Sequence, residues 1–421
     1  MVFRFVAAAV AASLMYSGTS GADTVETSTR PLPRPSAETT TPVVPVAVPN
    51  PGFDAWVRGF RGRALDAGVS ATVFDRAFRT ARYNPEVVER DRNQSEFTRS
   101  IWDYLDRAAS ESRVTGGKDA LRLYRAVLDR IEAKYGVEKE VVVAIWGMES
   151  AYGSFRGDLP IIGSLATLAY DGRRGTFFEQ QLVAALKILQ NGDTTPENMT
   201  GSWAGAMGHT QFIPTSFEAL AVDFTGDGRR DIWSDDPTDA LASTAAYLAR
   251  YKWQQGQPWG VEVKLPDGFD YAQARRDNVR LPSEWAKDGI VDMDGKPVAD
   301  HGAASVLLPA GARGAAFLIF SNFSVIARYN AADAYVIGVG HLSDRIRGGE
   351  AIRAEWPRDD PALNFDDRQT LQSLLTARGF DTKGVDGRIG PNSIAAVRAF
   401  QKSEGVAPDG YASQSLLARL R

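Results

Sequence analysis

One apolar run with a single ionisable group inside it constrains this chain more than any other stretch. The run from Val141 to Gly153 reads Val-Val-Val-Ala-Ile-Trp-Gly-Met-Glu-Ser-Ala-Tyr-Gly. Read as a helix, it places Glu149 on the same face as Val142 and Ile145, because residues three, four and seven apart share a face. A carboxyl held among apolar side chains has a raised pKa, and general-acid cleavage of a glycosidic bond requires a protonated acid. The alternative is a structural glutamate that turns to solvent or pairs with an arginine.

The first residues predict export. Arg4 precedes an apolar run from Phe5 to Met15 and a small-residue end at Ala22, which is typical of a secretory signal. We therefore expect a signal peptide over residues 1–22 and a Pro/Thr-rich linker over residues 23–51. The apolar run is too short for a transmembrane helix and no later stretch is long enough, so we expect a soluble mature protein.

Composition excludes several classes of protein. The chain has no cysteine, which excludes disulfides and thiolate metal sites. A net charge of -4, with scattered basic residues, gives no electrostatic footprint for nucleic acid. The three histidines, His209, His301 and His341, lie far apart and lack the helix spacing of a zinc hydrolase.

Hydrophobic spacing divides the rest of the 421-residue chain into a large, mainly α region and a small α tail. Helical patterns recur from residue 53 to residue 251 and return at residues 331–347. Between them, residues 253–320 are rich in Pro, Gly and Asp and indicate loops with short strands. We expect one domain over residues 52–350 and a compact three-helix module over residues 362–421.

A second informative stretch, residues 201–216, reads Gly-Ser-Trp-Ala-Gly-Ala-Met-Gly-His-Thr-Gln-Phe-Ile-Pro-Thr-Ser. Its glycines and small residues would let a ligand approach the backbone closely. Ser202 and Gln211 could form hydrogen bonds with an acid or a sugar. A tightly packed structural turn would have the same composition.

Residues 223–231 follow directly and match a calcium loop. Oxygen ligands fall at positions one, three, five and seven, namely Asp223, Thr225, Asp227 and the carbonyl of residue 229, with glycine at position six. Position twelve is Ser234 instead of glutamate, so the closing carboxylate would come from Asp235, Asp236 or Asp239. An Asp-Gly-rich turn without a metal is the alternative.

Two further groups could contact a carbohydrate. Arg173 and Arg174 precede Phe177, which suits a cationic and stacking surface for a sugar that bears carboxylates. Asn330 and Tyr335 supply an amide and a phenol for hydroxyl groups. A solvated arginine pair and ordinary core residues are the alternatives.

Several motifs follow one another in a fixed order. They are Met148-Glu149-Ser150 with Tyr152-Gly153, the glycine-rich stretch of residues 201–212, the loop that begins at Asp223, and Asn322-Phe323 with Arg328-Tyr329-Asn330. Together they resemble the lytic murein transglycosylases of the membrane-bound B type, over about residues 53–348. The tail resembles the small peptidoglycan-binding domain of many wall hydrolases, through Leu371-Gln372, Asp386-Gly387, Gly390, Phe400-Gln401 and Asp409-Gly410.

The resemblance implies a mainly α fold: a lysozyme-like catalytic domain with a small β/loop insertion, plus the C-terminal three-helix module. It implies cleavage of the β-1,4 bond between N-acetylmuramic acid and N-acetylglucosamine in peptidoglycan. Glu149 would protonate the leaving oxygen and then, as a carboxylate, accept the proton of the muramoyl C6 hydroxyl, which closes onto C1. The product is a 1,6-anhydromuramic end and no water is consumed, unlike glycosidases with two carboxylates.

The resemblance also implies which residues support this chemistry. The family's supporting groups fall on Ser202, Gln211, Tyr247 and Tyr335, and its substrate-binding groups fall on Tyr104, Arg173, Arg174, Phe177 and Asn330. Phe177 stands where several relatives have tyrosine, so that hydroxyl is missing here. The family's metal loop falls on Asp223, Thr225, Asp227 and the Arg229 carbonyl, with Asp239 or Asp236 closing a structural calcium site.

The expected partners are peptidoglycan glycan strands, without nucleic acid and without a cofactor for the chemistry. The protein would be a periplasmic monomer associated with the cell wall. Two other functions stay open from the sequence: a hydrolytic muramidase, and a non-catalytic peptidoglycan-binding protein with the same fold.

Overall fold

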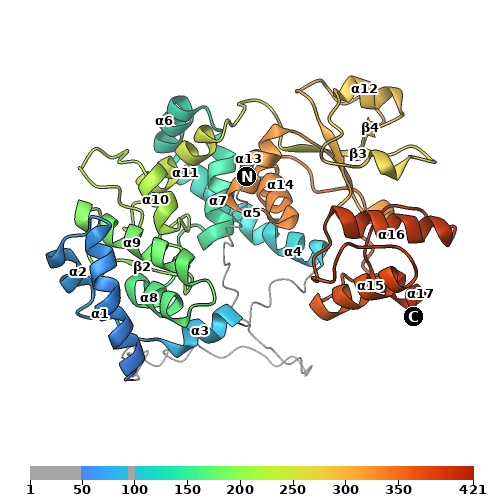
Figure 1. Ribbon diagram of the computed structural model, residues 1–421. Helices are drawn as coiled ribbons and strands as arrows, with labels where there is room; N and C mark the ends of the chain where they lie inside the picture. The colour runs from blue at the N-terminus through green and yellow to red at the C-terminus, as the bar shows by residue number, and fades with distance from the viewer. Residues whose placement is uncertain (1–48, 93–99) are drawn as a thin grey trace, which may run out of the picture.

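The computed structural model describes residues 49–92 and 100–421 (Figure 1). The expected signal peptide and nearly all of the expected linker lie outside these residues. Within the described part of the chain, none of the helices has both the length and the apolar character that a bilayer crossing requires.

The helix that contains Glu149, α7, is the centre of the large helical region. It packs against α14, α5, α11 and α6, and Figure 1 shows it in the middle of these helices. All ten residues from Val141 to Ser150 are buried, which explains why the run is apolar on every side. The helices of this region are α4 (Ile101–Ala108), α5 (Glu111–Leu123), α6 (Arg125–Tyr135), α7 itself (Lys139–Ser150), α10 (Pro214–Leu220), α11 (Thr238–Arg250), α13 (Ser321–Tyr329) and α14 (Asp333–Arg347).

A second group of helices lies beside this centre. The long pair α8 (Ile161–Asp171) and α9 (Gly175–Asn191) forms its core. Three N-terminal helices pack onto this pair, namely α1 (Pro51–Asp66), α2 (Ala71–Ala77) and α3 (Pro85–Arg92). The short strands β1 (Leu159–Pro160) and β2 (Thr200–Gly201) pair antiparallel and join the segment after α7 to the glycine-rich stretch.

The expected β insertion is an antiparallel sheet with the strand order β4-β3-β6-β5. Its strands are β3 (Gly260–Lys264), β4 (Val291–Asp292), β5 (Ser305–Leu307) and β6 (Ala316–Ile319), and helix α12 (Pro282–Lys287) accompanies them. Single 3-10 turns lie at Tyr271–Gln273 and Gly311–Arg313. The sheet has its own small core around Trp285 and Leu318, so it folds as an appendage of the helical region.

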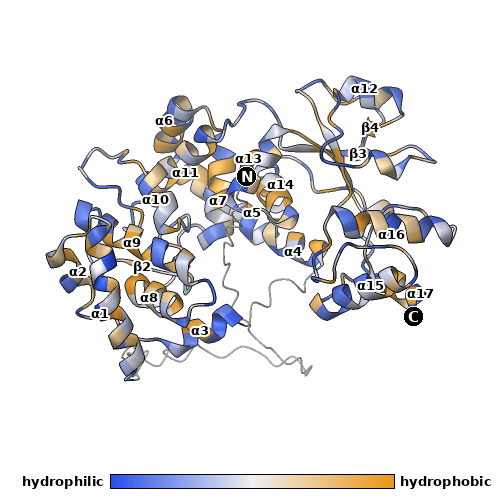
Figure 2. Cartoon of the chain, in the orientation of Figure 1, coloured by the Kyte–Doolittle hydropathy of each residue, from blue (hydrophilic) through white to orange (hydrophobic). Residues whose placement is uncertain are grey.

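The C-terminal tail has three helices, as the spacing predicts: α15 (Phe365–Ala377), α16 (Pro391–Ser403) and α17 (Gln414–Leu420). Each has a hydrophobic and a hydrophilic side (Figure 2), and the hydrophobic sides form a separate core that includes Leu371 and Phe400. The tail lies beside the sheet in Figure 1. The Asp409 carboxylate accepts a hydrogen bond from the Ala312 N–H at 2.8 Å, which ties the tail to the β insertion.

A buried carboxyl joins the β insertion to the helical centre. Asp344, near the end of α14, accepts a hydrogen bond from the Trp259 indole at 2.8 Å. Burial raises the pKa of Asp344 from 3.8 to about 6. Because the folded pKa lies above the ordinary value, the stability that this group contributes is present below pH 3.8 and is lost as the pH rises through 6.

We predict that Asp344→Asn stabilises the protein at pH 8 by about 1–2 kcal/mol, because the amide carries no charge and still accepts from Trp259. The gain should vanish below about pH 3, where the carboxyl is protonated in both states. Urea unfolding at the two pH values measures this difference. Asp75→Asn, at an exposed carboxylate paired with Arg61, is the control; an equal gain there, or one independent of pH, contradicts the prediction.

Candidate active site

Glu149 lies in the last turn of α7 with 8% of its surface exposed. The helix ends directly after it, because Ala151 and Tyr152 adopt left-handed backbone angles with φ of 48° and 59°. The carboxyl is therefore buried in the way the helical spacing predicts. It stands at the end of a helix, where the chain turns away.

A phenol reaches this carboxyl from the opposite helix. The Tyr335 hydroxyl, at the start of α14, donates a hydrogen bond to Glu149 Oε1 at 2.6 Å. Burial, and then the nearby Glu149 charge, raise the pKa of Tyr335 well above its ordinary value, so this hydroxyl stays a proton donor. The structure thus brings together two residues that are 186 positions apart and that the sequence analysis assigned to one site.

Three aromatic rings continue the site along α11 and α13. The rings of Tyr329 and Tyr247 are tilted by 57° with 4.9 Å between their centroids, and Phe212 contacts both edge-on at 5.8 Å. The Tyr247 hydroxyl donates to the Arg328 carbonyl at 2.6 Å, and the Tyr329 hydroxyl donates to the Thr210 carbonyl at 2.7 Å. Both hydroxyls are therefore committed to backbone, and the cluster serves to hold the glycine-rich stretch against the helices.

Tyr104 lies on the other side of Tyr335. It is partly buried on α4 and packs close to Gly338, where an added Cβ would lie 3.1 Å from the Tyr104 ring and 3.3 Å from the Met148 side chain. A glycine on α14 thus lets this ring approach the residue before Glu149. The geometry agrees with the expected place of Tyr104 near the acid.

Ser202 and Gln211 lie on the stretch that packs against the segment after α7. Gly157 in that segment has a φ of 82°, and a Cβ there would lie 2.3 Å from the Gly201 carbonyl carbon, so the two backbones touch. The Ser202 hydroxyl accepts from the Ala206 N–H at 3.0 Å. Gln211 donates its amide N–H groups to the Arg156 and Gly208 carbonyls at 3.0 and 2.9 Å. In this structure Gln211 therefore braces the backbone beside the acid.

The arginine pair differs from the open cationic surface that the sequence suggests. Arg173 and Arg174 both donate to the carboxylate of Asp91, at 2.6 and 2.7 Å, and Asp91 is 2% exposed. Burial alone would raise the pKa of Asp91, but the two guanidinium groups hold it below its ordinary value. The partner comes from α3, which no local pattern could reveal.

The remaining predicted contacts are partly used inside the fold. The Arg174 guanidinium lies 4.8 Å from the Phe178 ring centroid and 6.0 Å from that of Phe177. The Asn330 amide oxygen accepts from the Ala332 N–H at 3.0 Å, just before α14 begins. Phe177 and Asn330 are both partly exposed, so their ring and amide still reach the surface.

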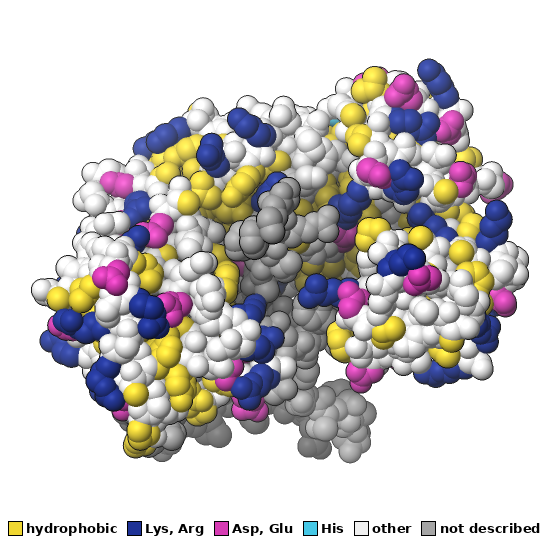
Figure 3. Space-filling view, viewed as in Figure 1, with side chains coloured by type: hydrophobic (Ala, Val, Ile, Leu, Met, Phe, Trp, Pro, Cys, Tyr) yellow, Lys and Arg dark blue, Asp and Glu magenta, His cyan; other side chains and the backbone are white. Residues whose placement is uncertain are grey.

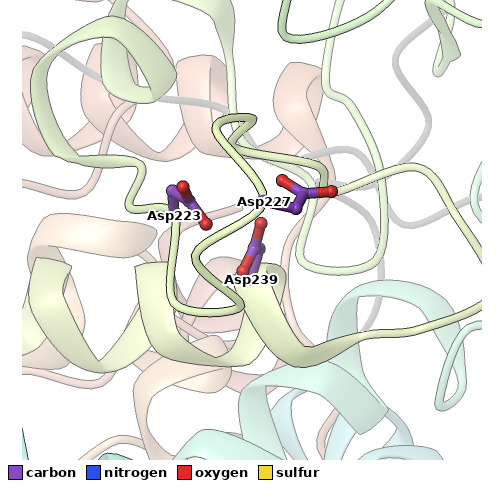
Figure 4. Close-up of side chains that lie close together, drawn as sticks. All are labelled: Asp223, Asp227 and Asp239. Atoms are coloured by element: carbon purple, nitrogen blue, oxygen red, sulfur yellow. The ribbon is translucent and has the colours of Figure 1, made fainter.

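The loop of residues 223–231 gathers carboxylates, as its spacing predicts. One carboxylate oxygen from each of Asp223, Asp227 and Asp239 lies within 4.8 Å of the others. Figure 4 shows Asp239 rising from the start of α11 between the other two. Hard oxygen donors in this number suit calcium, so the residues fit the ion that the spacing suggests.

The structure also decides between the candidate closing residues. Asp239 accepts from the N–H groups of Phe224, Thr225 and Asp231, so its carboxylate holds the backbone of the loop at three points. Asp236 instead accepts from Thr238 at the start of α11, and Asp235 is exposed and pairs with Arg156. Thr225 donates to Asp223 and the Arg229 N–H donates to Asp227, which shapes the loop further.

Burial raises the pKa of Asp239, although three backbone N–H groups favour its charged form. The nearby Asp223 charge acts in the same direction. Three carboxylates so close together repel one another, and a divalent cation would relieve that repulsion.

Sequence reasoning gave no role to Asp91, Arg156 or His209, although each holds part of the site. Asp91 and Arg156 were ordinary charged residues in their segments, and their partners lie 82 and more than 50 residues away. His209 stood inside the glycine-rich stretch but was considered only as a metal ligand. Its position inside that recognised stretch was the signal that could have identified it.

Comparisons with known proteins agree on one family. The family model described as Transglycosylase SLT domain matches residues 52–344, and that of a peptidoglycan binding domain matches residues 365–420. Membrane-bound lytic murein transglycosylase B of Escherichia coli (strain K12) is 32% identical over 250 residues, which are 58% of this chain and 66% of that protein. The match therefore spans just under two thirds of that relative.

Solved structures extend the likeness to both parts of the chain. SltB3 from Pseudomonas aeruginosa, in complex with NAG-anhNAM-pentapeptide, is 49% identical with a TM-score of 0.86, and the match covers 88% of this chain and 100% of that chain. Slt35 of Escherichia coli, in complex with calcium, is 28% identical with a TM-score of 0.60. That match covers 71% of this chain and 93% of Slt35.

Proposed function

The chain belongs to the transglycosylase SLT domain family and is a lytic transglycosylase acting on peptidoglycan, and we propose that Glu149 is its catalytic acid and base. The fold class expected from the sequence is confirmed: a mostly helical, lysozyme-like domain with a C-terminal peptidoglycan-binding domain. The observation that carries the proposal for Glu149 is its burial at the end of α7 together with the Tyr335 hydroxyl at 2.6 Å.

The proposed reaction needs two proton transfers at one carboxyl. Protonated Glu149 gives its proton to the glycosidic oxygen between N-acetylmuramic acid and N-acetylglucosamine as the C1–O bond breaks. The resulting carboxylate takes the proton of the muramoyl C6 hydroxyl as that oxygen bonds to C1. The acid is thereby regenerated, and no water enters the balance.

The Tyr335 phenol suits this cycle. A hydroxyl that donates to Glu149 Oε1 stabilises the carboxylate that forms after the first transfer. The group opposite Glu149 on α14 is a phenol, whereas a hydrolase of the usual kind places a second carboxylate beside its acid. The SltB3 complex with NAG-anhNAM-pentapeptide supports an anhydromuramic product, and the complex with NAG-NAM-pentapeptide supports binding of peptidoglycan fragments.

The other site residues have supporting or binding roles in this proposal. Ser202 hydrogen-bonds the acid, and Gln211 and Tyr247 keep the glycine-rich stretch and the α13 backbone in place. Tyr104, Arg173, Arg174, Phe177 and Asn330 contact the glycan or its substituents. Arg173 and Arg174 both donate to Asp91. Only those guanidinium N–H groups that do not bond Asp91 would be available to substrate.

We assign catalysis to residues 52–350 and wall retention to residues 362–421. A tethered wall-binding domain raises the local concentration of glycan strands at the active site without adding a catalytic group. We also propose export through the signal peptide at residues 1–22 and action as a monomer in the periplasm. On the face seen in Figure 3 basic and acidic side chains are interspersed, which agrees with a glycan partner rather than nucleic acid.

A structural calcium site completes the proposal. Asp223, Thr225, Asp227, the Arg229 carbonyl and Asp239 would hold the ion, and the complex of Slt35 with calcium supports this choice. The ion would fix the loop and the start of α11, and it would take no part in bond cleavage.

We predict that Glu149→Gln abolishes cleavage, with a loss of at least about a hundredfold, because an amide cannot deliver the proton. Binding to insoluble peptidoglycan should persist. Mass spectrometry of digested peptidoglycan should show anhydromuramic ends for the unchanged protein. Glu140→Gln, in the first turn of the same helix, is the matched control and should keep activity.

Two results would contradict this function. Reducing muramic ends would indicate a hydrolytic muramidase, and unchanged wall turnover by Glu149→Gln would leave only a binding function.

We predict that Tyr335→Phe lowers kcat about tenfold and leaves KM nearly unchanged, because the lost hydrogen bond stabilises the carboxylate formed during the reaction. Release of soluble fragments from purified peptidoglycan measures both constants. Tyr247→Phe removes a hydroxyl that donates to backbone and serves as the comparison. A larger loss for Tyr247→Phe than for Tyr335→Phe would argue against the role given to Tyr335.

We predict that excess calcium raises the melting temperature relative to a chelator, by mass action on the folded state. Asp227→Asn should lose most of that shift, because it removes a ligand. Asp236→Asn should keep it, because Asp236 only caps α11 through Thr238. Identical melting curves with and without calcium would mean that the loop binds no calcium.

A further inference from the structure

His209 connects the end of α7 to the loop of residues 223–235. Its side chain is 4% exposed and lies between the two segments. The Trp146 indole N–H donates to His209 Nδ1 at 3.1 Å, and His209 Nε2 lies 2.7 Å from the Ser234 carbonyl oxygen. One imidazole thus contacts the catalytic helix with one nitrogen and the loop with the other.

The partners leave only one protonation state for this ring. The indole can only donate, so Nδ1 must accept and carry no proton. A neutral ring carries one proton, so Nε2 holds it and donates to the Ser234 carbonyl at 2.7 Å. The Arg156 guanidinium, 3.2 Å from Nε2, can only donate and therefore forms no hydrogen bond with that nitrogen. Burial lowers the pKa of His209, and the Arg156 charge lowers it further. The hydrogen bond to the Ser234 carbonyl and the charges of Asp235 and Asp231 raise it, but by less than burial lowers it. The ring is therefore a fixed neutral connector.

The backbone of His209 holds the same turn. Its carbonyl accepts from the Ser150 hydroxyl, which in turn accepts from the Gly153 N–H at 3.0 Å. Gly153 has a φ of 85°, and a Cβ there would lie 2.6 Å from His209 Nδ1. The turn that follows Glu149 is thus enclosed by His209 on two sides.

The other end of the connection reaches the carboxylates of the loop. The His209 N–H donates to the Ile232 carbonyl at 3.0 Å. The Ser234 N–H donates to Asp231 Oδ1 at 3.1 Å, and the Asp231 N–H donates to Asp239 Oδ2 at 3.0 Å. Arg156 donates to the same Ser234 carbonyl at 2.8 Å. A continuous set of hydrogen bonds therefore runs from Asp239 to the turn after Glu149.

We propose that His209 is a positioning residue that fixes the Glu149 turn by attaching it, through Nε2–H, to the Ser234 carbonyl of the loop. The proposal rests on the catalytic role of Glu149 proposed above and deepens it. The loop then contributes to turnover by holding the acid in place. A small displacement of a reacting group costs rate more than binding, so the effect belongs in kcat.

Two conservative variants separate the two ring contacts. In His209→Gln the amide N–H takes the place of Nε2–H and still reaches the Ser234 carbonyl, while the acceptor for Trp146 is lost. In His209→Asn the amide oxygen takes the place of Nδ1 and still accepts from Trp146, while the reach to Ser234 is lost. Both variants keep the backbone contacts of the residue.

The test measures kcat and KM on purified peptidoglycan, together with hydrogen exchange of the full chain. We expect His209→Asn to lower kcat about ten- to a hundredfold with KM unchanged, and to speed amide exchange at residues 150–157. His209→Gln should recover most of kcat and slow exchange at that turn.

Equal losses of kcat in both variants, or a larger loss of kcat in His209→Gln, would overturn the proposal. The contact with Ser234 would then not be what positions the turn. Faster exchange confined to residues 231–236 would overturn it as well. Glu149→Gln, measured alongside, separates the positioning role of His209 from the catalytic role of Glu149. That variant should lose turnover and keep the slow amide exchange at residues 150–157.

Discussion

Burial of one carboxyl in a helix that is apolar on every side is the constraint on which this structure depends. Removing a carboxyl from water is unfavourable, and this cost must be offset by hydrogen bonds to the carboxyl and by the burial of the apolar residues of the helix. α7 does so because α5, α11 and α14 enclose it over its whole length. The acid lies in the last turn, just before the left-handed residues Ala151 and Tyr152 end the helix. Tyr335 satisfies one carboxylate oxygen there without adding a second charge.

The parts of the fold with local patterns could be predicted from the sequence. The apolar spacing around Glu149, the strands near residues 261–265 and 316–320, and the three helices of the tail all follow from periodicity and turn residues, and the structure contains each of them. The aspartate cluster could also be predicted, since Asp223 and Asp227 stand at fixed offsets within one loop. Such features need no knowledge of distant residues.

Long-range partners could not be predicted, because nothing in a local pattern identifies them. Arg173 and Arg174 have the composition of a binding surface, yet Asp91 on α3 neutralises much of their charge. The choice of Asp239 over Asp236 depends on the direction in which α11 leaves the loop, and three backbone N–H groups decide it. In both cases the sequence supplied correct residue types, and only the tertiary structure determined which atoms they reach.

The C-terminal tail contains two Asp-Gly turns with the same hydrogen-bond pattern, and one of them makes an additional contact. Gln372 accepts from the Gly387 N–H and donates to Asp386, and Gln401 makes the same pair of contacts with Gly410 and Asp409. The two Asp-Gly turns that echo each other in sequence are therefore built in the same way. Only the second also uses its aspartate to bind the Ala312 N–H of the β insertion. That contact joins the tail to the β insertion, which the first turn does not reach.

Glycines inside helices usually weaken them, by about 1 kcal/mol each relative to alanine, and three of them here have a packing reason. A Cβ at Gly116, Gly117 or Gly147 would lie 2.9 Å or less from the Tyr152 side chain, so α5 and α7 both need a glycine surface to receive that ring. The Tyr152 hydroxyl then donates to the Arg113 carbonyl at 2.6 Å. The side chain that follows the acid by three residues thus joins the two helices. Helix propensity is given up at these positions because the Tyr152 side chain fills the space beside them and joins α5 to the end of α7.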